Sequence, residues 1–355
     1  MKALILESKP YSQYHFGEYS IDETRLNHTS EVPHADTLYS AIINVYNQNF
    51  DDTDDFVTML DLTDFEMSSA CYCLNGNGTY IFFLPKPLVL NTMVNDSANY
   101  KTQKKITYVS KGVWEKGFDL NNISSEELCL LGDKFLCLNK ELKAIKPNKI
   151  KQKFWPEITL SSVSYLTKTQ VHTEEQTGTL YVQANIQIQD LQEFDISVHF
   201  YFLLKHKLDA ETASKLDLVL SLLPETGIGG ERSVGCGTFG SISVQEFEIK
   251  PLDPAPDTFS NVSMIAPVTE DELKRIRYYS TTLRGGRRLG GDNDPHENTL
   301  KQVRMVREGA LIEHNQPIGH NPSIKPASTT KDEYLRFGKG FLLPIHKNWT
   351  KQWQD

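Results

Sequence analysis

A run of glycines between Gly227 and Gly240 has residue types suited to holding a phosphate group. It reads G-I-G-G-E-R-S-V-G-C-G-T-F-G, with six glycines. Glycines leave main-chain N–H groups unshielded and permit positive φ, so this backbone can approach a phosphate closely. Arg232 could add a charge-assisted hydrogen bond. A glycine-rich turn that binds nothing is the alternative.

The elements on either side decide what kind of loop this is. Residues 209–224 have an N-cap candidate in Asp209, good helix formers and a proline stop at Pro224, so we expect a helix. Residues 238–250 alternate as a strand does. A dinucleotide-binding glycine motif has the opposite order, strand then helix, and a nucleotide-hydrolase phosphate loop ends in Gly-Lys-Ser/Thr. The order helix, loop, strand excludes the dinucleotide-binding motif. The phosphate loop is excluded because Gly-Lys-Ser/Thr is absent here.

A second polar stretch lies near the N-terminus. Tyr14-His-Phe-Gly-Glu is followed by His28-Thr-Ser-Glu-Val-Pro-His-Ala-Asp-Thr-Leu-Tyr-Ser. Apolar residues at helical spacing predict a helix over 36–48 with Asp36 as its N-cap. His34 and Ser40 then lie near the start of that helix, where an anion is favoured. Capping and loop hydrogen bonds are their alternative roles, and Tyr14 and Phe16 could stack on a base or fill the core.

No set of residues forms a convincing catalytic or metal centre. The histidines lack zinc spacing, and the five cysteines form no C-x-x-C pair, so we expect reduced thiols. Asp51-Asp-Thr-Asp-Asp lacks the glycine and distal glutamate of a calcium loop. Gly290-Gly-Asp-Asn-Asp resembles a polymerase palm motif, but we interpret it as a turn. We expect no enzyme activity and no cofactor.

Charge is distributed unevenly along the chain. The net charge of −9 argues against a general nucleic-acid binder. However, residues 51–66 hold seven acids and no base, residues 134–153 hold seven lysines and one acid, and residues 274–291 hold six Lys/Arg and no acid. Such a chain could bind RNA on one face and protein on another, although each run could equally be a solvated surface. No apolar run is long enough to span a membrane, and no secretory signal is present, so we expect a cytoplasmic protein.

The pattern of strands and helices predicts an α+β protein with two domains. Strands at 1–7, 78–84, 196–204 and 238–250, with helices at 36–48 and 209–224, give a ferredoxin-like (RRM-like) β-α-β-β-α-β domain over residues 1–250. We expect insertions at 106–118 and at 158–190, the second a long hairpin. Residues 251–257 form a predicted linker, and residues 258–355 a smaller α/β domain.

Taken together and in order, these motifs resemble a known family. The P-H-A-D-T-L-Y-S-A-I run, the segment 168–181 ending in G-T-L-Y, the glycine run, V-R-M-V-R-E-G-A (303–310) and the final strand 334–345 are similar to those of the RAMP superfamily of CRISPR-associated proteins. The branch they resemble is the subunit of type III-A (Csm) effector complexes that caps the five-prime tag of the CRISPR RNA. His172, Thr173 and Ala310 depart from the pattern of that branch.

The resemblance implies a non-catalytic RNA-binding subunit. Its implied partners are the CRISPR RNA, a large polymerase-like subunit and a backbone RAMP subunit, and the hairpin would act as a thumb that displaces a base. In a splayed single strand, phosphates position the RNA while stacking and edge contacts read the bases. The candidate RNA-binding residues are Tyr14, His15, Phe16, His34, Ser40, Val171, His172, Gly229, Gly230, Arg232, Ser233, Gly235, Gly237, Phe239, Arg284, Arg287 and Arg288. Tyr181 is a further candidate, with hairpin packing as its alternative.

Three other functions stay open from sequence. A RAMP-type endoribonuclease would place a histidine base near its glycine loop, but that loop then lies close to the C-terminus, whereas about a hundred residues follow it here. A backbone subunit that cleaves target RNA would carry a loop aspartate, which we do not find. The type III-B counterpart of the capping subunit is the third.

Overall fold

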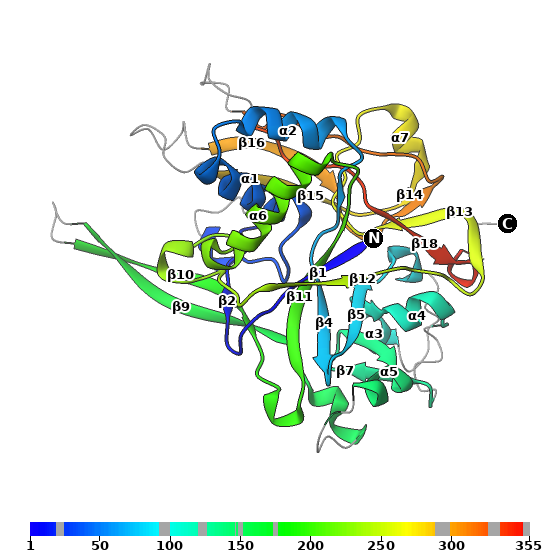
Figure 1. Cartoon of the computed structure of the whole chain (residues 1–355). Coiled ribbons are helices and arrows are strands. Elements are labelled where there is room, and N and C mark those ends of the chain that lie inside the picture. Colours follow the sequence, from blue (N-terminus) through cyan, green and yellow to red (C-terminus); the bar gives the residue numbers. More distant parts are fainter. Residues whose placement is uncertain are drawn as a thin grey trace.

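The computed structural model describes residues 1–18, 25–91, 100–119, 126–145, 147, 152–172, 177–287, 299–325 and 334–350 (Figure 1). A nine-stranded mixed sheet forms its centre, which confirms the α+β class. Eight of its strands run in the order β12 (Ile242–Glu246), β1 (Lys2–Leu6), β11 (Ser197–Lys205), β4 (Cys71–Gly76), β5 (Thr79–Pro85), β6 (Tyr108–Ser110), β8 (Phe135–Leu138) and β7 (Leu128–Leu131). The ninth, β3 (Glu66–Met67), pairs with β11.

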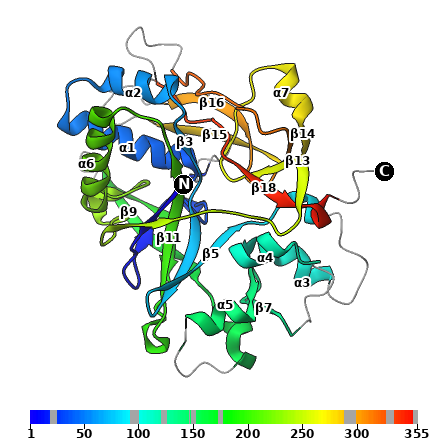
Figure 2. The same ribbon diagram turned by 45° about the vertical axis from the view of Figure 1, so that its right-hand side comes forward.

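The two faces of the sheet bury different partners because side chains alternate along each strand. Leu4 and Leu6 of β1 pack in a cluster with helices α1 (Ala35–Asn49) and α6 (Ala210–Thr226). Ala3 and Ile5 face the other way, into a cluster with the C-terminal strands. Figures 1 and 2 show α1 and α6 together on one side of the central strands.

The elements β1, α1, β4, β11, α6 and β12 follow one another in the predicted β-α-β-β-α-β order. Three details differ from the sequence prediction. The strand beside β11 is β4, which the sequence analysis missed, and the predicted strand at 78–84 is the next one out, β5. The predicted strand 238–250 shortens to β12. Pro224 does not end its helix, since α6 continues to Thr226 and the Gly227 N–H caps it on the Leu223 carbonyl.

The start of α1 corrects a second prediction. His34, not Asp36, is the N-cap residue, and Asp36 lies inside the first helical turn and is buried. A carboxylate in the first turn is still favoured by the helix dipole. The neighbouring helix α2 (Thr53–Leu62) begins inside the acidic run and carries Asp54 and Asp55 in its own first turn.

Two insertions interrupt the central sheet, as predicted. The long hairpin comprises β9 (Ser161–His172) and β10 (Thr177–Ile188), and Figure 1 shows it extending away from the body. Its base pairs with β2 (Gln13–Tyr14). The other insertion surrounds β6, β7 and β8 and contains the short helices α3 (Tyr100–Lys105), α4 (Lys111–Lys116) and α5 (Asn139–Ala144).

The C-terminal part adds two smaller sheets. One has the order β14 (Ile276–Tyr278), β17 (Leu311–Glu313), β13 (Pro254–Asn261) and β18 (Leu342–His346); the other is the hairpin of β15 (Thr281–Arg287) and β16 (Thr299–Val306). Helix α7 (Glu270–Arg275) precedes β14. Residues 254–257, which we expected in a linker, begin β13 instead. The predicted division into residues 1–250 and 258–355 stays a prediction.

No helix in the described ranges is long and apolar enough to cross a membrane. The five cysteines are free thiols and are buried.

Candidate nucleic-acid interface

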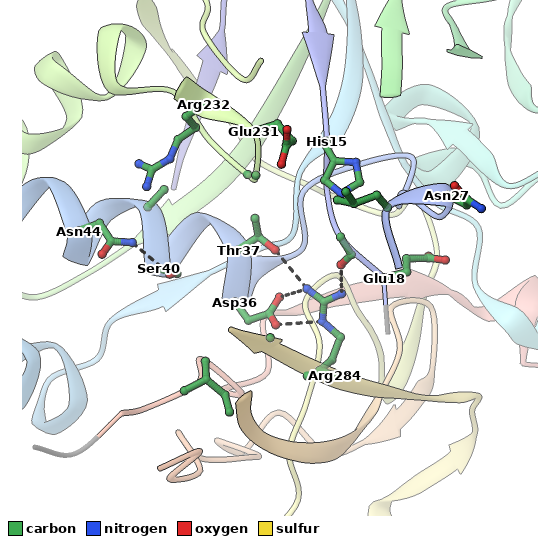
Figure 3. Close-up of a pocket in the computed structure, with 18 of the residues that line it drawn as sticks. His15, Glu18, Asn27, Asp36, Thr37, Ser40, Asn44, Glu231, Arg232 and Arg284 are labelled. Atoms are coloured by element: carbon green, nitrogen blue, oxygen red, sulfur yellow. Dashed lines mark hydrogen bonds and ion pairs between the residues drawn. The ribbon is translucent and has the colours of Figure 1, made fainter. Parts of the chain in front are cut away.

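A cleft of about 1170 Å³ lies where four segments meet (Figure 3). These are the N-terminal stretch around His15, the outer face of α1, the glycine loop, and the β15–β16 hairpin with the nearby residues Leu335 and Arg336. The half of the β9–β10 hairpin nearer its turn closes one side through Thr167 and residues 179–182. Six sequence candidates line this cleft: His15, Ser40, Gly229, Gly230, Arg232 and Arg284. Tyr181 lines it as well.

The glycine loop is held against the chain beside β2 by its own main-chain groups. Gly230 N–H donates to the His15 carbonyl at 2.8 Å, and Gly237 N–H donates to Gln13 at 2.8 Å. At Gly229 (φ 87°) a Cβ would lie 2.5 Å from the His15 carbonyl oxygen, so only glycine fits this close approach. The amides of Gly230 and Gly237 are therefore used within the fold, which corrects the expectation that they cradle a phosphate.

His15 is held in one orientation at the edge of the cleft. His15 is 4% exposed, and its Nδ1 lies 2.7 Å from the carbonyl oxygen of Ala184 in β10. A carbonyl can only accept, so Nδ1 carries the proton, and in the neutral ring Nε2 is then an acceptor. A Cβ built on Gly17 would lie 3.9 Å from Nε2, and one on Gly230 would lie 3.2 Å from Cδ2. This edge of the ring thus faces the glycines that line the cleft.

A buried ion cluster forms the floor and joins α1 to the C-terminal part. Arg284 of β15 donates to both oxygens of Asp36 at 2.9 Å and to Thr37 Oγ1 at 3.1 Å (Figure 3). Arg336 also donates to Asp36, and to the Gly285 carbonyl at 3.1 Å. Burial opposes the ionisation of Asp36, but the two arginine charges outweigh it and hold its pKa well below the usual range.

A second buried pair lies beside this cluster. His34 Nδ1 lies 2.8 Å from Glu308 Oε1, and His34 Nε2 lies 2.9 Å from Ser30 Oγ. Ser69 also donates to Glu308. Burial opposes ionisation of Glu308, yet His34 and the hydrogen bonds from His34 and Ser69 lower its pKa to about 2. His34 therefore fastens α1 to the turn after β16 and does not line the cleft, which corrects its predicted role at an anion site.

Two charged residues of the glycine loop, Glu231 and Arg232, line the cleft. Glu231 has φ 57°, and its carboxylate lies 3.4 Å from Lys168 Nζ of β9. Arg232 begins a short 3₁₀ turn, and Figure 3 shows its side chain directed toward the side of α1 that carries Ser40 and Asn44, away from Glu231. Ser233 and Gly235 are exposed beyond it. The loop thus presents one cation and one anion in different directions.

Three aromatic candidates belong to the core instead. Tyr14, Phe16 and Phe239 are 0%, 1% and 5% exposed, and Tyr14 and Phe16 pack on Phe200 of β11. Tyr14 and Phe16 thus fill the core, which was the alternative to stacking on a base, and the buried Phe239 corrects its prediction as an RNA-binding residue. Val171, His172 and Arg287 lie where only the backbone is described, and Arg288 lies outside the described residues.

Sequence analysis missed several residues of the cleft. Arg336, Thr37, Asn44 and Asn27 line it, as do Glu18 and Glu231. Thr37 lies one turn before Ser40 and Asn44 one turn after it on the same face of α1, so helical periodicity could have identified them. Arg336 and Asn27 carried no sequence signal, because only the tertiary structure brings them here. Among the described residues, no three His, Cys, Asp or Glu side chains are grouped as a metal site would require.

Comparisons with known proteins find a relative and solved structures that are similar over nearly the whole chain. No protein-family model matches the chain. The CRISPR-system protein Csm4 of Methanocaldococcus jannaschii is 25% identical over 92% of this chain and 89% of its own length. A chain of the crystal structure of the Csm3–Csm4 subcomplex from a type III-A CRISPR-Cas interference complex matches with a TM-score of 0.67 at 22% identity, covering 98% of this chain and 100% of that one. A chain of the Csm1–Csm4 cassette in complex with cA4 matches with a TM-score of 0.51 at 16% identity, covering 98% of each.

Proposed function

We propose that this chain, a homologue of the CRISPR-system protein Csm4, is a non-catalytic RNA-binding subunit of a type III-A effector complex and holds the five-prime tag of the CRISPR RNA in its cleft. The observation that carries the proposal is the convergence of the glycine loop, the outer face of α1 and Arg284 on one cleft. Arg232, Ser40 and Asn44 offer donors for phosphate and ribose oxygens along one wall.

The same proposal gives the chain two protein partners. The similar solved structures are assemblies named Csm3–Csm4 and Csm1–Csm4. We infer that this chain likewise joins a large Csm1-type subunit to a Csm3-type backbone subunit, and that it does so in the cytoplasm as part of antiviral defence.

The β9–β10 hairpin is proposed to act as a thumb on the RNA that leaves the cleft. Its exposed apolar side chains are unusual for a free hairpin: Tyr165 is 65% exposed, Leu180 70% and Val163 45%. Apolar and aromatic side chains on a projecting hairpin can pack against unstacked bases. Leu180 also lines the cleft, so a strand leaving the cleft would meet the hairpin directly.

A nuclease function is the second candidate, and the histidine contacts weigh against it. A general base must reach the proton that it removes. His34 is 4% exposed and engaged on both ring nitrogens, by Glu308 and Ser30. Of the two histidines, only His15 faces the cleft. The carboxylates that line the cleft with it are Glu18, Asp36 and Glu231. Asp36 is paired with two buried arginines, and Glu231 contacts Lys168.

The proposal is tested by co-expressing the full chain with its partner subunits and a CRISPR array, sequencing the RNA that copurifies, and mapping ultraviolet crosslinks. We expect tag nucleotides to crosslink to residues 229–234 and 179–182. Arg232→Ala should weaken tag binding about three- to tenfold and reduce the salt slope by about 0.7, the effect of one lost phosphate contact. Arg277→Ala removes an exposed arginine outside the cleft and is the control, so it should change neither the tag affinity nor the salt slope. Crosslinks confined to the guide region would indicate a backbone subunit instead. Cleavage of precursor RNA that depends on His15 would indicate a nuclease.

A further inference from the structure

The two walls of the cleft differ in the hydrogen bonds that they can make. Figure 3 shows Arg232, Asn44 and Ser40 together on one side, and Glu231 and His15 on the other. The first group offers cationic and polar donors. The second offers a carboxylate and, in the neutral ring, the Nε2 lone pair of His15. A phosphodiester suits the first wall and is repelled by Glu231 on the second.

The acceptor character of His15 follows from its fixed ring. The bond from Nδ1 to Ala184 leaves Nε2 near Gly17 and the adjacent Cδ2 near Gly230, and both glycines line the cleft. These two glycines place no side chain over it. A ligand donor can therefore reach a preoriented acceptor, which loses little entropy on binding.

Glu231 supplies a second acceptor beside it. Its backbone has a left-handed φ of 57°, which is uncommon for a residue with a side chain, and the turn bonds from Val234 and Cys236 to its carbonyl help to hold it there. The contact with Lys168 at 3.4 Å engages only one carboxylate oxygen. The side chain is 28% exposed, so the other oxygen can accept a hydrogen bond from a ligand.

We propose that His15 Nε2 and the Glu231 carboxylate read one unpaired base of the bound RNA by accepting hydrogen bonds from its exocyclic amino group. This rests on the proposed function and adds base selectivity to it. Adenine, cytosine and guanine carry such an amino group. Uracil has none, and its one donor on that edge, N3–H, is flanked by two carbonyl oxygens that Glu231 repels. The wall thus selects an amino-bearing base at one position and rejects uracil there.

The test uses synthetic RNAs with the five-prime sequence of the RNA that copurifies with the complex. One position at a time, adenosine is replaced by purine riboside, guanosine by inosine, or cytidine by zebularine, each of which lacks the exocyclic amino group. Affinity is measured with the complex that contains the full chain. We expect one position at which removal of the amino group weakens binding about five- to tenfold, as one charged or preoriented hydrogen bond would, and little effect elsewhere.

His15→Asn separates the two functions of the ring. The asparagine amide can still donate to Ala184 in place of Nδ1, but no atom replaces Nε2. In this variant the penalty for the missing amino group should become smaller, because only Glu231 still accepts from that group. Glu231→Gln, on a partly exposed side chain, should reduce the same penalty and so provides the test if His15→Asn does not fold. His206→Asn, in a separate hollow beside Lys2, is the matched control and should keep the full penalty.

The outcomes separate this inference from the proposed function. If the tag crosslinks to the cleft but no amino-group removal matters at any position, the base reading is wrong and the tag binding stands. If His15→Asn weakens every RNA equally and lowers the salt slope, His15 contacts a phosphate and the inference is also wrong. If the RNA does not crosslink to the cleft at all, both fail.

Discussion

Asp36 is a buried carboxylate that forms ion pairs with two buried arginines, Arg284 and Arg336. Its side chain is 1% exposed, while those of Arg284 and Arg336 are 7% and 9% exposed. Buried charges are tolerated only when they are paired and hydrogen-bonded, so each member depends on the others. Because the arginines come from the C-terminal part and Asp36 from α1, this cluster sets the position of the cleft floor.

Removing the Asp36 charge should therefore destabilise the protein strongly. We predict that Asp36→Asn lowers the free energy of unfolding by about 3–5 kcal/mol, because two buried guanidinium groups lose their counter-charge. Urea denaturation followed by circular dichroism measures this. Asp217→Asn, on the exposed face of α6, should change it by less than about 0.5 kcal/mol. Equal effects of the two substitutions would contradict the account.

Glu308 should give the protein a defined sensitivity to acid. Its pKa falls to about 2 in the folded protein, below the unfolded value of about 4.3, so its contribution is fully present above the unfolded pKa and is lost as the pH falls toward the folded pKa. We predict that the stability difference between wild type and Glu308→Gln is fully present at pH 5 and shrinks between about pH 4 and 2. A stability difference between the two proteins that grows as the pH falls would show that folding does not lower the pKa of Glu308.

At the scale of elements, the glycine loop is shaped by packing as much as by any ligand. Three of its glycines, Gly229, Gly235 and Gly237, have φ between 86° and 89°, but their surroundings differ. A Cβ on Gly237 would lie 2.2 Å from the Ile228 carbonyl oxygen, whereas one on Gly235 would meet nothing within 4 Å. Gly237 is thus required both by its positive φ and by its packing against Ile228, whereas Gly235 is required by its positive φ alone.

This difference predicts unequal costs for the same substitution. Gly235→Ala should destabilise by about 1 kcal/mol, the cost of a left-handed alanine. Gly237→Ala should cost about 1–3 kcal/mol more, because the loop must move away from Ile228. The two variants form a matched pair in φ, and thermal unfolding compares them directly. If both cost the same, the contact with Ile228 does not constrain the loop.

At the scale of the whole molecule, the two predicted domains share a hydrophobic cluster. Ala3, Ile5, Tyr201 and Leu203 of the central sheet pack in one cluster with Val262, Leu311, Phe341 and Leu343. Trp114 and Trp349 meet edge to face at 5.6 Å, and each indole N–H donates across the boundary, to Pro344 and Phe118 respectively. Neither part can bury this surface alone.

We therefore expect the full chain to unfold in one cooperative transition. Scanning calorimetry should show a single peak whose calorimetric and van't Hoff enthalpies agree. Leu343→Ala, on β18, should shift that whole peak to lower temperature, because it opens a cavity in the shared cluster. Two separated peaks, with Leu343→Ala moving only one, would instead indicate independent domains.

Local pattern alone was enough to determine the α+β class, the element order and the two long insertions. Helical spacing in α1 and α6, strand alternation in β1 and β11, and the glycine-rich loop are properties of neighbouring residues, so they can be read along the chain. The order of motifs also indicated the family resemblance. The strand β4 was missed because its residues, Cys71–Gly76, are largely buried and show no alternation.

Only the tertiary structure decided what these residues contact. Tyr14 and Phe16 face the core because β2 crosses beneath the glycine loop, and Asp36 became an ion-pair partner because β15 returns to α1 after about 250 residues. Arg336 and Glu231 entered the cleft by the same long-range approach. Such contacts join segments far apart in sequence, and no local pattern specifies which side chain will be buried, paired or left facing a ligand.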